Sequence, residues 1–437
     1  MACAGTPLRK LPAVLAVLMS PVLWAAPLSA FVECAASFDG GYAAARADYE
    51  ARVANSAQLR TQILPRVEMT SSLNATKGEF ETRGESTDRR FQSYEIGARV
   101  VQPIYNAGAL ISHDQADVQR RIAENSLNAD RQSLATKVSG AYLDVLAAAD
   151  RLEVIHAEIA ANKVQFDQTH ARYAEGLTSS ADVLSVELRL KFLLLNASQQ
   201  QTEIEARKLS LAALCPRHMS PDASIYDELE KENGEKSLDA HLHALRTSNP
   251  ELLKLQQAVI FAELEVRRAE KQHAPVLNGV LAVNWQKHPR GVIDVPHERS
   301  IRTASAGIQL TVPLYSGGAT EHKIREASAL RDKAAGLLSQ REQELEAQLR
   351  TDFLRLHSAR RDLKAGRVAL EVAESAYRAN VLGYTNGVRL LSELLIAQTQ
   401  IADAKQRILL TQQLVAKTVL SIRSADGRLA EFGDGPR

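Results

Sequence analysis

The feature that most limits the fold is an internal duplication. The segment VVQPIYNAG (100–108) has a counterpart in LTVPLYSGG (310–318), each with an apolar run, a proline, an aliphatic residue, a tyrosine and a glycine. The matching positions are Pro103, Tyr105 and Gly108 in the first copy and Pro313, Tyr315 and Gly318 in the second. The offset, 313 − 103 = 210, is close to half of the 437 residues. This spacing is too long for a solenoid repeat, so it predicts one folding unit built twice.

Other segments repeat in the same order at offsets of 210 or 211. They are LPRVEMTSSL (64–73) with APVLNGVLAV (274–283), AYLDVLAAADRL (141–152) with DFLRLHSARRDL (352–363), and RYAEGLTSSADVL (172–184) with GYTNGVRLLSELL (383–395). A polar stretch separates the copies and is typical of a linker. The predicted organisation is a signal peptide at 1–30, a first repeat at 31–215, a polar equatorial linker at 216–238, a second repeat at 239–423 and a C-terminal tail at 424–437.

The N-terminus has the pattern of a secretory signal. Arg9 and Lys10 precede the apolar stretch 11–24, and Ala30 offers a small residue at the cleavage point. The alternative is a membrane anchor, which the shortness of the run and its two prolines disfavour. Export would place the mature chain in an oxidising compartment.

Two cysteines, Cys34 and Cys215, follow the predicted signal peptide. Glu33 precedes Cys34, so this cysteine is not in a lipidation motif. A Cys34–Cys215 disulfide and two unpaired buried thiols fit the sequence equally well.

Each copy contains two stretches with the period-two alternation of a strand. They lie at 65–76 and 91–103 in the first copy and at 275–286 and 301–313 in the second. Their length suits tilted strands that cross a bilayer, and the polar segments 77–90 and 286–300 are expected to be long turns. The alternation places Tyr94, Ile96, Ile308 and Leu310 toward lipid, and Glu95, Arg99, Thr303 and Gln309 toward a lumen.

Helical periodicity follows Pro103 and Pro313, so each repeated segment predicts a corner between strand and helix. Apolar positions then step by four and three, as in a coiled-coil seam, at Leu134, Val138, Ala141, Val145, Ala148, Leu152, Ile155 and Ile159. The long helices end at glycine turns, YAEGL with Gly176 and YTNGV with Gly387, and a second helix returns from each.

Four strands per chain cannot close a barrel, and an open sheet edge cannot face lipid. Three chains would supply twelve strands, an even number within the known range. The predicted fold is mainly α with transmembrane β. It comprises a long coiled-coil α-helical barrel and a 12-stranded outer-membrane β-barrel shared by a homotrimer, with internal duplication in each chain.

The duplicated motifs together resemble the TolC family of outer-membrane efflux and secretion channels. They are VQPIYNAG, VPLYSGG, SNPEL (248–252) and the two tip turns, and the resemblance covers roughly residues 40–423. It implies a homotrimer in the outer membrane of a Gram-negative bacterium that extends into the periplasm. It also implies docking to a periplasmic adaptor protein and an inner-membrane ABC exporter or proton-driven pump.

The resemblance assigns roles at the helical tips. Asp182, Tyr384 and Arg389 match residues whose polar links hold the periplasmic end of such channels shut. Glu393 matches the first of two acids that ring the opening, whereas Ile396 stands in place of the second. The alternative is that these are ordinary polar side chains at solvated helix ends.

The sequence contains no nucleotide, zinc-protease or hydrolase motif, and no cofactor, metal or catalytic residue is expected. A net charge of +1 gives no reason to expect nucleic acid as a partner. A periplasmic coiled-coil scaffold or adaptor would explain the heptads but not the paired strands. Among channels, the missing lipidation motif favours type I protein secretion, with multidrug or small-molecule efflux as the alternative.

Overall fold

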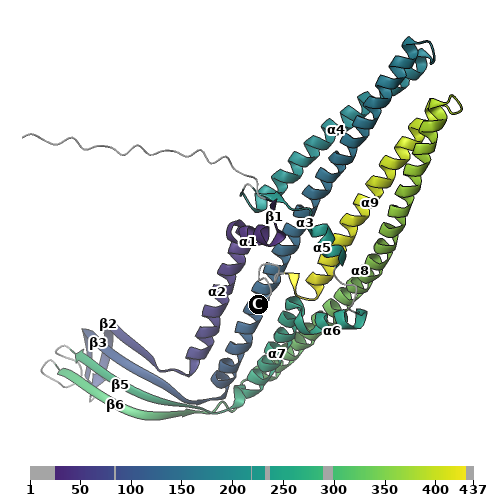
Figure 1. Ribbon diagram of the computed structural model, residues 1–437. Helices are drawn as coiled ribbons and strands as arrows, with labels where there is room; N and C mark the ends of the chain where they lie inside the picture. The colour runs from purple at the N-terminus through teal and green to yellow at the C-terminus, as the bar shows by residue number, and fades with distance from the viewer. Residues whose placement is uncertain (1–24, 83–84, 218, 232–236, 289–298, 430–437) are drawn as a thin grey trace, which may run out of the picture.

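The computed structural model describes residues 25–82, 85–217, 219–231, 237–288 and 299–429. Figure 1 shows an elongated chain with a four-stranded sheet at one end, two long helical hairpins at the other, and short elements beside the middle of the helices. The expected combination of long helices, four strands per chain and an internal duplication is confirmed.

The sheet has the order β2-β3-β5-β6, and all its pairs are antiparallel. Its strands are β2 (Arg66–Thr82), β3 (Glu85–Asn106), β5 (Val276–His288) and β6 (Arg299–Thr311). The expectation of a long turn at 77–90 is wrong, because β2 and β3 remain paired from Lys77↔Arg90 to Thr82↔Glu85. Apolar alternation stops there, but a backbone ladder does not require apolar side chains. Of the second expected turn, residues 289–298 lie outside the described residues.

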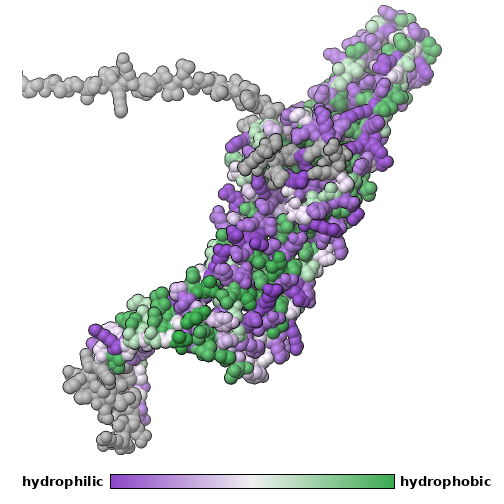
Figure 2. Space-filling view, turned by 60° about the horizontal axis from the view of Figure 1, so that its bottom comes forward, coloured by the Kyte–Doolittle hydropathy of each residue, from purple (hydrophilic) through white to green (hydrophobic). Residues whose placement is uncertain are grey.

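The strand register sorts side chains onto two faces. One cross-strand row is Val67, Val100, Leu281 and Ala306, and the next is Met69, Ala98, Val283 and Ala304. Tyr94, Ile96, Ile308 and Leu310 lie on this same side, which we call the apolar face. The opposite side, the polar face, carries Glu68, Thr70, Glu95, Arg99, Asn284, Thr303, Ser305 and Gln309. In Figure 2, hydrophobic colour gathers over the strands next to the helices.

The two corners between strand and helix are not equivalent. Pro103 was expected to end a strand, but β3 passes it with a register shift between Pro103 and Tyr105 and continues to Asn106. The Asn106 side chain then accepts from Ala109 N at 3.1 Å and caps α3 (Ala107–Ala174), so Gly108 lies inside the helix. In the second copy β6 stops before Pro313 and Tyr315, and Gly317 and Gly318 adopt positive φ before α8 (Ala319–Thr385). Glycine tolerates that conformation because it lacks Cβ.

The long helices form two successive layers. Next to the sheet the order is α2 (Gly40–Arg60), α3, α7 (Pro250–Glu270) and α8, and short 3-10 turns at Thr61–Ile63 and Lys271–His273 lead into the strands. Toward the tips the order is α4 (Ser180–Leu214), α3, α9 (Leu391–Ala425) and α8. The predicted seam is confirmed, since Leu134, Val138, Val145, Ala148 and Ile155 are all buried. None of the described helices is both long and apolar enough to cross a membrane.

Short elements pack beside the middle of the helices. They are β1 (Ala25–Ala26), α1 (Leu28–Phe38), β4 (Ser220–Pro221), α5 (Ile225–Lys231) and α6 (Leu238–Ser248). The expected linker therefore carries structure, because Ile225 and Leu229 of α5 are buried in the main core. Cys34 and Cys215 form a disulfide between α1 and the end of α4, with Cα atoms 5.5 Å apart. The expected cleavage site after Ala30 falls in the first turn of α1.

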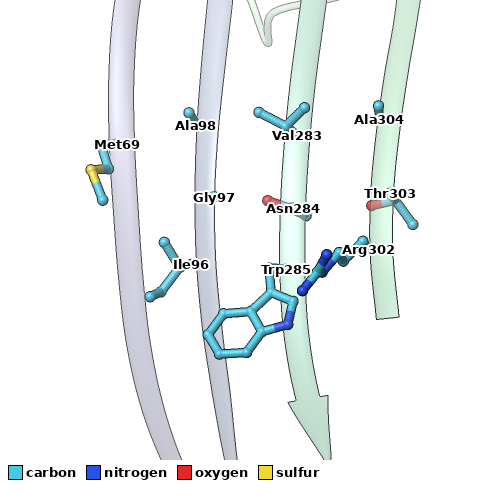
Figure 3. Close-up of a pocket in the computed structure, with 10 residues that line it drawn as sticks. All are labelled: Met69, Ile96, Gly97, Ala98, Val283, Asn284, Trp285, Arg302, Thr303 and Ala304. Carbon is cyan, nitrogen blue, oxygen red and sulfur yellow. The ribbon is translucent and has the colours of Figure 1, made fainter. Parts of the chain in front are cut away.

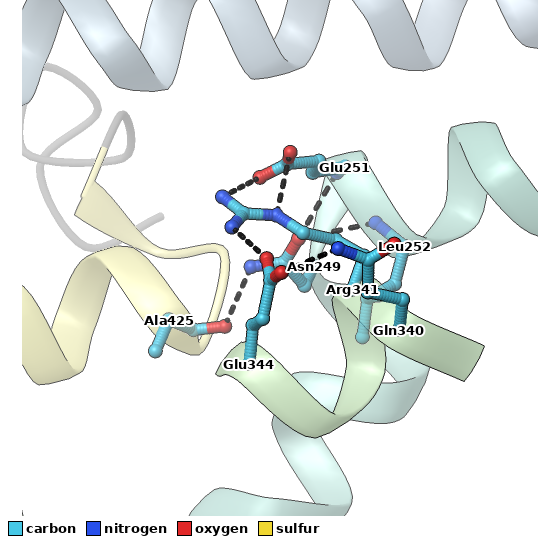
Figure 4. A network of polar contacts seen from close by, with 7 residues as sticks. All are labelled: Asn249, Glu251, Leu252, Gln340, Arg341, Glu344 and Ala425. Atoms are coloured by element: carbon cyan, nitrogen blue, oxygen red, sulfur yellow. Dashed lines mark hydrogen bonds and ion pairs between the residues drawn. The ribbon is translucent and has the colours of Figure 1, made fainter. Parts of the chain in front are cut away.

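A polar network ties α7 to α8 and to the end of α9 (Figure 4). Arg341 donates to both carboxylate oxygens of Glu251, at 2.8 and 3.0 Å, and to Glu344 at 2.9 Å. Asn249 caps α7 by accepting from Glu251 N and Leu252 N, while its amide donates to Ala425 O at 3.0 Å. The chain thus uses side-chain hydrogen bonds to fix the start of α7 against α8 and the end of α9.

Candidate functional site at the helical tips

The two tips are built by the same backbone device. Gly176 and Gly387 have φ of 72° and 73°, the left-handed region that glycine adopts without strain. Leu177 N donates to Arg172 O and Val388 N to Gly383 O, each reaching back five residues. Each glycine N–H also donates to the carbonyl three residues before it, which completes a Schellman motif at each helix end. Both predicted tip turns therefore stop a long helix with the same hydrogen bonds.

Asp182 contributes to the start of the first returning helix. Its carboxylate accepts from Thr178 Oγ1 at 2.8 Å, from Ser179 Oγ at 2.9 Å and from Ser179 N at 3.3 Å. Ser179 in turn accepts from Asp182 N, so the two residues form a capping box. The hydrogen bond from Thr178, followed by those from Ser179, holds the pKa of Asp182 below its ordinary value. The second returning helix has Leu390 at its N-cap and no side-chain cap.

Arg389 and Glu393 form an ion pair on the second tip. The Arg389 Nη1 to Glu393 Oε2 distance is 2.7 Å, one helical turn apart, and both side chains are exposed. Gly383 makes room for this arginine, because a Cβ there would lie 2.4 Å from Arg389 Cγ. Gly383 was not identified as a contact residue from the sequence. Its signal was that the equivalent position of the first copy, 211 residues earlier, is Arg172 and not glycine.

Tyr384 lies inside a small apolar cluster where the two hairpins of the chain meet. It is 8% exposed and packs with Val186, Leu391 and Leu394. The Arg172 guanidinium stands 4.8 Å from the centre of its ring, a cation–π distance, and Arg172 Nη1 donates to Tyr384 O at 3.3 Å. The Tyr384 hydroxyl and Arg172 Nε are buried and have no hydrogen-bond partner among the described residues.

The structure places all four predicted tip residues at the tips, but it brings only Arg389 and Glu393 together within one chain. Asp182 is occupied by its own capping box and Tyr384 by the apolar cluster. Arg172 is the contact residue that sequence reasoning missed. Nothing specific in the sequence indicated this contact. Arg172 lies four residues before the glycine of the turn, and basic residues are common at helix ends.

The Asp182 cap gives a direct prediction. Asp182→Ala should speed hydrogen exchange of the first amides of α4 a few-fold at pH 7, because loss of a helix cap costs about 1 kcal/mol. The pKa of Asp182 is lowered in the fold, so its stabilising effect is present above the ordinary carboxyl pKa of about 4 and is lost as the pH falls through its folded pKa. The difference between variant and wild type should therefore shrink in acid.

Glu175→Gln, in the same turn but outside the capping box, is the matched control and should leave exchange of these amides unchanged. Equal exchange in wild type and Asp182→Ala at pH 7 would show that the capping box does not hold this end of α4.

Comparison with known proteins adds the family. The model of the outer membrane efflux protein family matches residues 42–215 and 241–428. The chain is 25% identical over 424 residues to outer membrane protein TolC of Vibrio cholerae, covering 94% of this chain and 93% of that protein. It is 26% identical to the alkaline protease secretion protein AprF of Pseudomonas aeruginosa, over 85% and 78% of the two chains.

Among solved structures, the outer-membrane channel OprN matches with a TM-score of 0.78 and 18% identity, over 92% of this chain and 89% of the other. This similarity shows a shared fold. Because the family model covers most of the sequence in two successive copies, the chain belongs to the outer membrane efflux protein family and is a channel protein of the bacterial outer membrane.

Proposed function

We propose that three copies of this chain form a channel through which an export system passes its cargo to the outside. This proposal rests on one observation: the sheet and both helical layers each end in two edge elements that have a neighbour on one side only. In the sheet, β2 and β6 pair on one side only, and in the helical layers α2 and α4 lie at one edge and α8 at the other. A rotation that joins these edges in three copies gives a 12-stranded barrel continuous with a helical tube.

Apolar side chains at the helical edges fit this assembly. On α4, Leu184, Leu188 and Leu195 are 63%, 58% and 53% exposed in the single chain, at coiled-coil spacing. On α8, Val368 and Val372 are 56% and 63% exposed. We propose that α4 of one copy packs against α8 of the next, so that these side chains leave water.

The cargo we propose is protein, exported by type I secretion together with a periplasmic adaptor and an inner-membrane ABC exporter. A relative named for alkaline protease secretion supports protein cargo, whereas the family is described only as efflux proteins and names no cargo. Deletion of the gene should remove one or a few large proteins from the culture medium and leave drug accumulation unchanged. Loss of drug export with an unchanged set of secreted proteins would instead show an efflux component that works with a proton-driven pump.

The tips supply the proposed gate. In a trimer the α3–α4 hairpin of one copy neighbours the α8–α9 hairpin of the next, which brings Asp182 toward a second copy of Arg389. A charge-assisted hydrogen bond between them, repeated three times at about 1 kcal/mol each, would keep the open state rare. Glu393, repeated around the threefold axis, would favour cations at the opening. Tyr384 would hold the two hairpins of one chain together through its apolar contacts.

Tyr384→Phe combined with Arg389→Ser should raise single-channel conductance in planar bilayers several-fold, because Arg389→Ser removes the link to Asp182. Tyr384→Phe removes any hydrogen bond that the hydroxyl makes to a neighbouring copy and keeps the apolar contacts of the ring. Tyr377→Phe with Arg378→Ser, the same pair of changes farther from the turn on α8, is the matched control and should conduct like wild type. If both double variants conduct alike, the tip polar residues do not form the gate. If the wild type gives no channels at all, the proposed function itself is wrong.

The sheet gives a second prediction. Ala306 lies near the middle of the membrane-crossing part of β6 on the apolar face, and Ser305 is its neighbour on the polar face. Ala306→Arg should cost about 2–4 kcal/mol because its charge would face lipid, whereas Ser305→Arg should be tolerated in a water-filled lumen. The yield of folded protein in outer-membrane fractions measures the difference, and equal yields would place the apolar face elsewhere.

A further inference from the structure

Two cations near the outer ends of β5 and β6, Arg302 and Lys287, lie on the apolar face of the sheet. Lys287 is one row farther from the helices and already takes part in an interaction within the fold. Arg302 of β6 is paired across the ladder with Trp285 of β5, and Ile96 continues the same row on β3. Figure 3 shows the guanidinium of Arg302 on the same side of the sheet as the Trp285 indole. Arg302 is exposed and forms no hydrogen bond or ion pair within the described part of the chain. A charge in such a row needs a reason, because an arginine that faces hydrocarbon is costly.

The position of Arg302 along β6 partly explains why a charge is tolerated here. From Arg302 to the helix-proximal end of β6 at Thr311 there are 311 − 302 = 9 residue steps. At about 3.3 Å per residue and a tilt of about 40°, this is about 23 Å of depth, close to the 25 Å height of an outer-membrane apolar band. The strand end near the helices lies on the periplasmic side, so Arg302 reaches the headgroup level of the outer leaflet. Trp285 fits this level too, since its Nε1 donates to Ser300 Oγ at 2.7 Å while its ring faces the apolar side.

A hollow lies beside Arg302 on the side toward the helices. Its volume is about 470 Å³, and Ala98, Val283 and Ala304 form a floor of small side chains between the larger Met69, Ile96 and Trp285. Gly97, Asn284 and Thr303 complete the lining, but Asn284 and Thr303 belong to the polar face. The side chains on the apolar face are therefore apolar apart from Arg302. A shape with an exposed guanidinium at the headgroup level and an apolar trough beneath it suits an amphiphile with an anionic head and a hydrocarbon tail.

We propose that Arg302 and this hollow bind a phosphorylated lipid of the outer leaflet, with the phosphate on the guanidinium and one acyl chain along Val283 and Ala304. This inference rests on the proposed function, because it requires the apolar face to be the outer surface of a membrane barrel. The planar guanidinium donates two parallel hydrogen bonds to phosphate, a geometry that arginine offers and lysine does not. A trimer would carry three such sites.

The test counts lipid on the purified full-length trimer by native mass spectrometry, with bisphosphorylated lipid A as the probe. Arg302→Gln should lower bound lipid about tenfold. Arg99→Gln, an arginine-to-glutamine change on the polar face, should have no effect. Ala98→Leu should also reduce binding because it fills the hollow and leaves Arg302 in place. Lipid A without phosphate should bind wild type as weakly as bisphosphorylated lipid A binds Arg302→Gln.

Three results would overturn the inference. One is equal lipid binding by wild type and Arg302→Gln. Another is displacement of the lipid by millimolar inorganic phosphate, which would show a site for soluble phosphate. The third is a lower melting temperature of Arg302→Gln than of wild type in lipid-free detergent, which would assign Arg302 to a contact between copies. In each case normal single-channel conductance of wild type would leave the proposed channel standing, whereas absence of channels would remove both.

Discussion

The unpaired edges of the four-stranded sheet are the constraint on which the rest of the structure depends. Each backbone N–H or C=O left without a partner in hydrocarbon costs several kcal/mol, and β2 and β6 both present such a row. The helical layers are also open at both edges. Helices α2 and α4 lie at the same edge of the chain as β2, and α8 lies at the same edge as β6. One rotational operation therefore satisfies the strands and the helices together. Because of the internal duplication, each copy of the chain contributes two strand pairs and two helical hairpins to the assembly.

The middle of the chain explains how such long helices keep their alignment. The seam of α3 uses small and aliphatic residues such as Val138, Val145 and Ala148, which let helices approach closely with few aromatics. At the same level Tyr142 is fully buried, stacks edge-on against Phe31 of α1 and accepts from Asp222 N at 2.6 Å. Burial raises the pKa of this tyrosine to about 12, so it stays neutral at physiological pH. The short elements beside the middle of the helices are thus held against α3 by Tyr142.

Much of this architecture could be predicted from the sequence because it rests on periodicity. The 210-residue offset, the change from period two to a heptad after Pro103 and Pro313, and the glycine turns each correspond to an observed element. The extension of the first hairpin could not be predicted, because polar strands that leave a membrane carry no alternation. Helix α5 was missed because two buried residues in a polar stretch make no pattern. At the tips, Arg172 acts through a contact between the two hairpins, which local sequence does not encode. Gly383 acts within the second tip, where the position of the Arg389 side chain depends on the three-dimensional path of the turn.

The mass of the purified, conducting protein in detergent tests the central claim most directly. Closure of the sheet edges by other copies predicts a single species of three chains, measured by light scattering with the detergent contribution subtracted or by native mass spectrometry. The same preparation should form channels in planar bilayers. A monodisperse species of one chain that still conducts would contradict the account, because a four-stranded sheet with two open edges could then reside in lipid by itself.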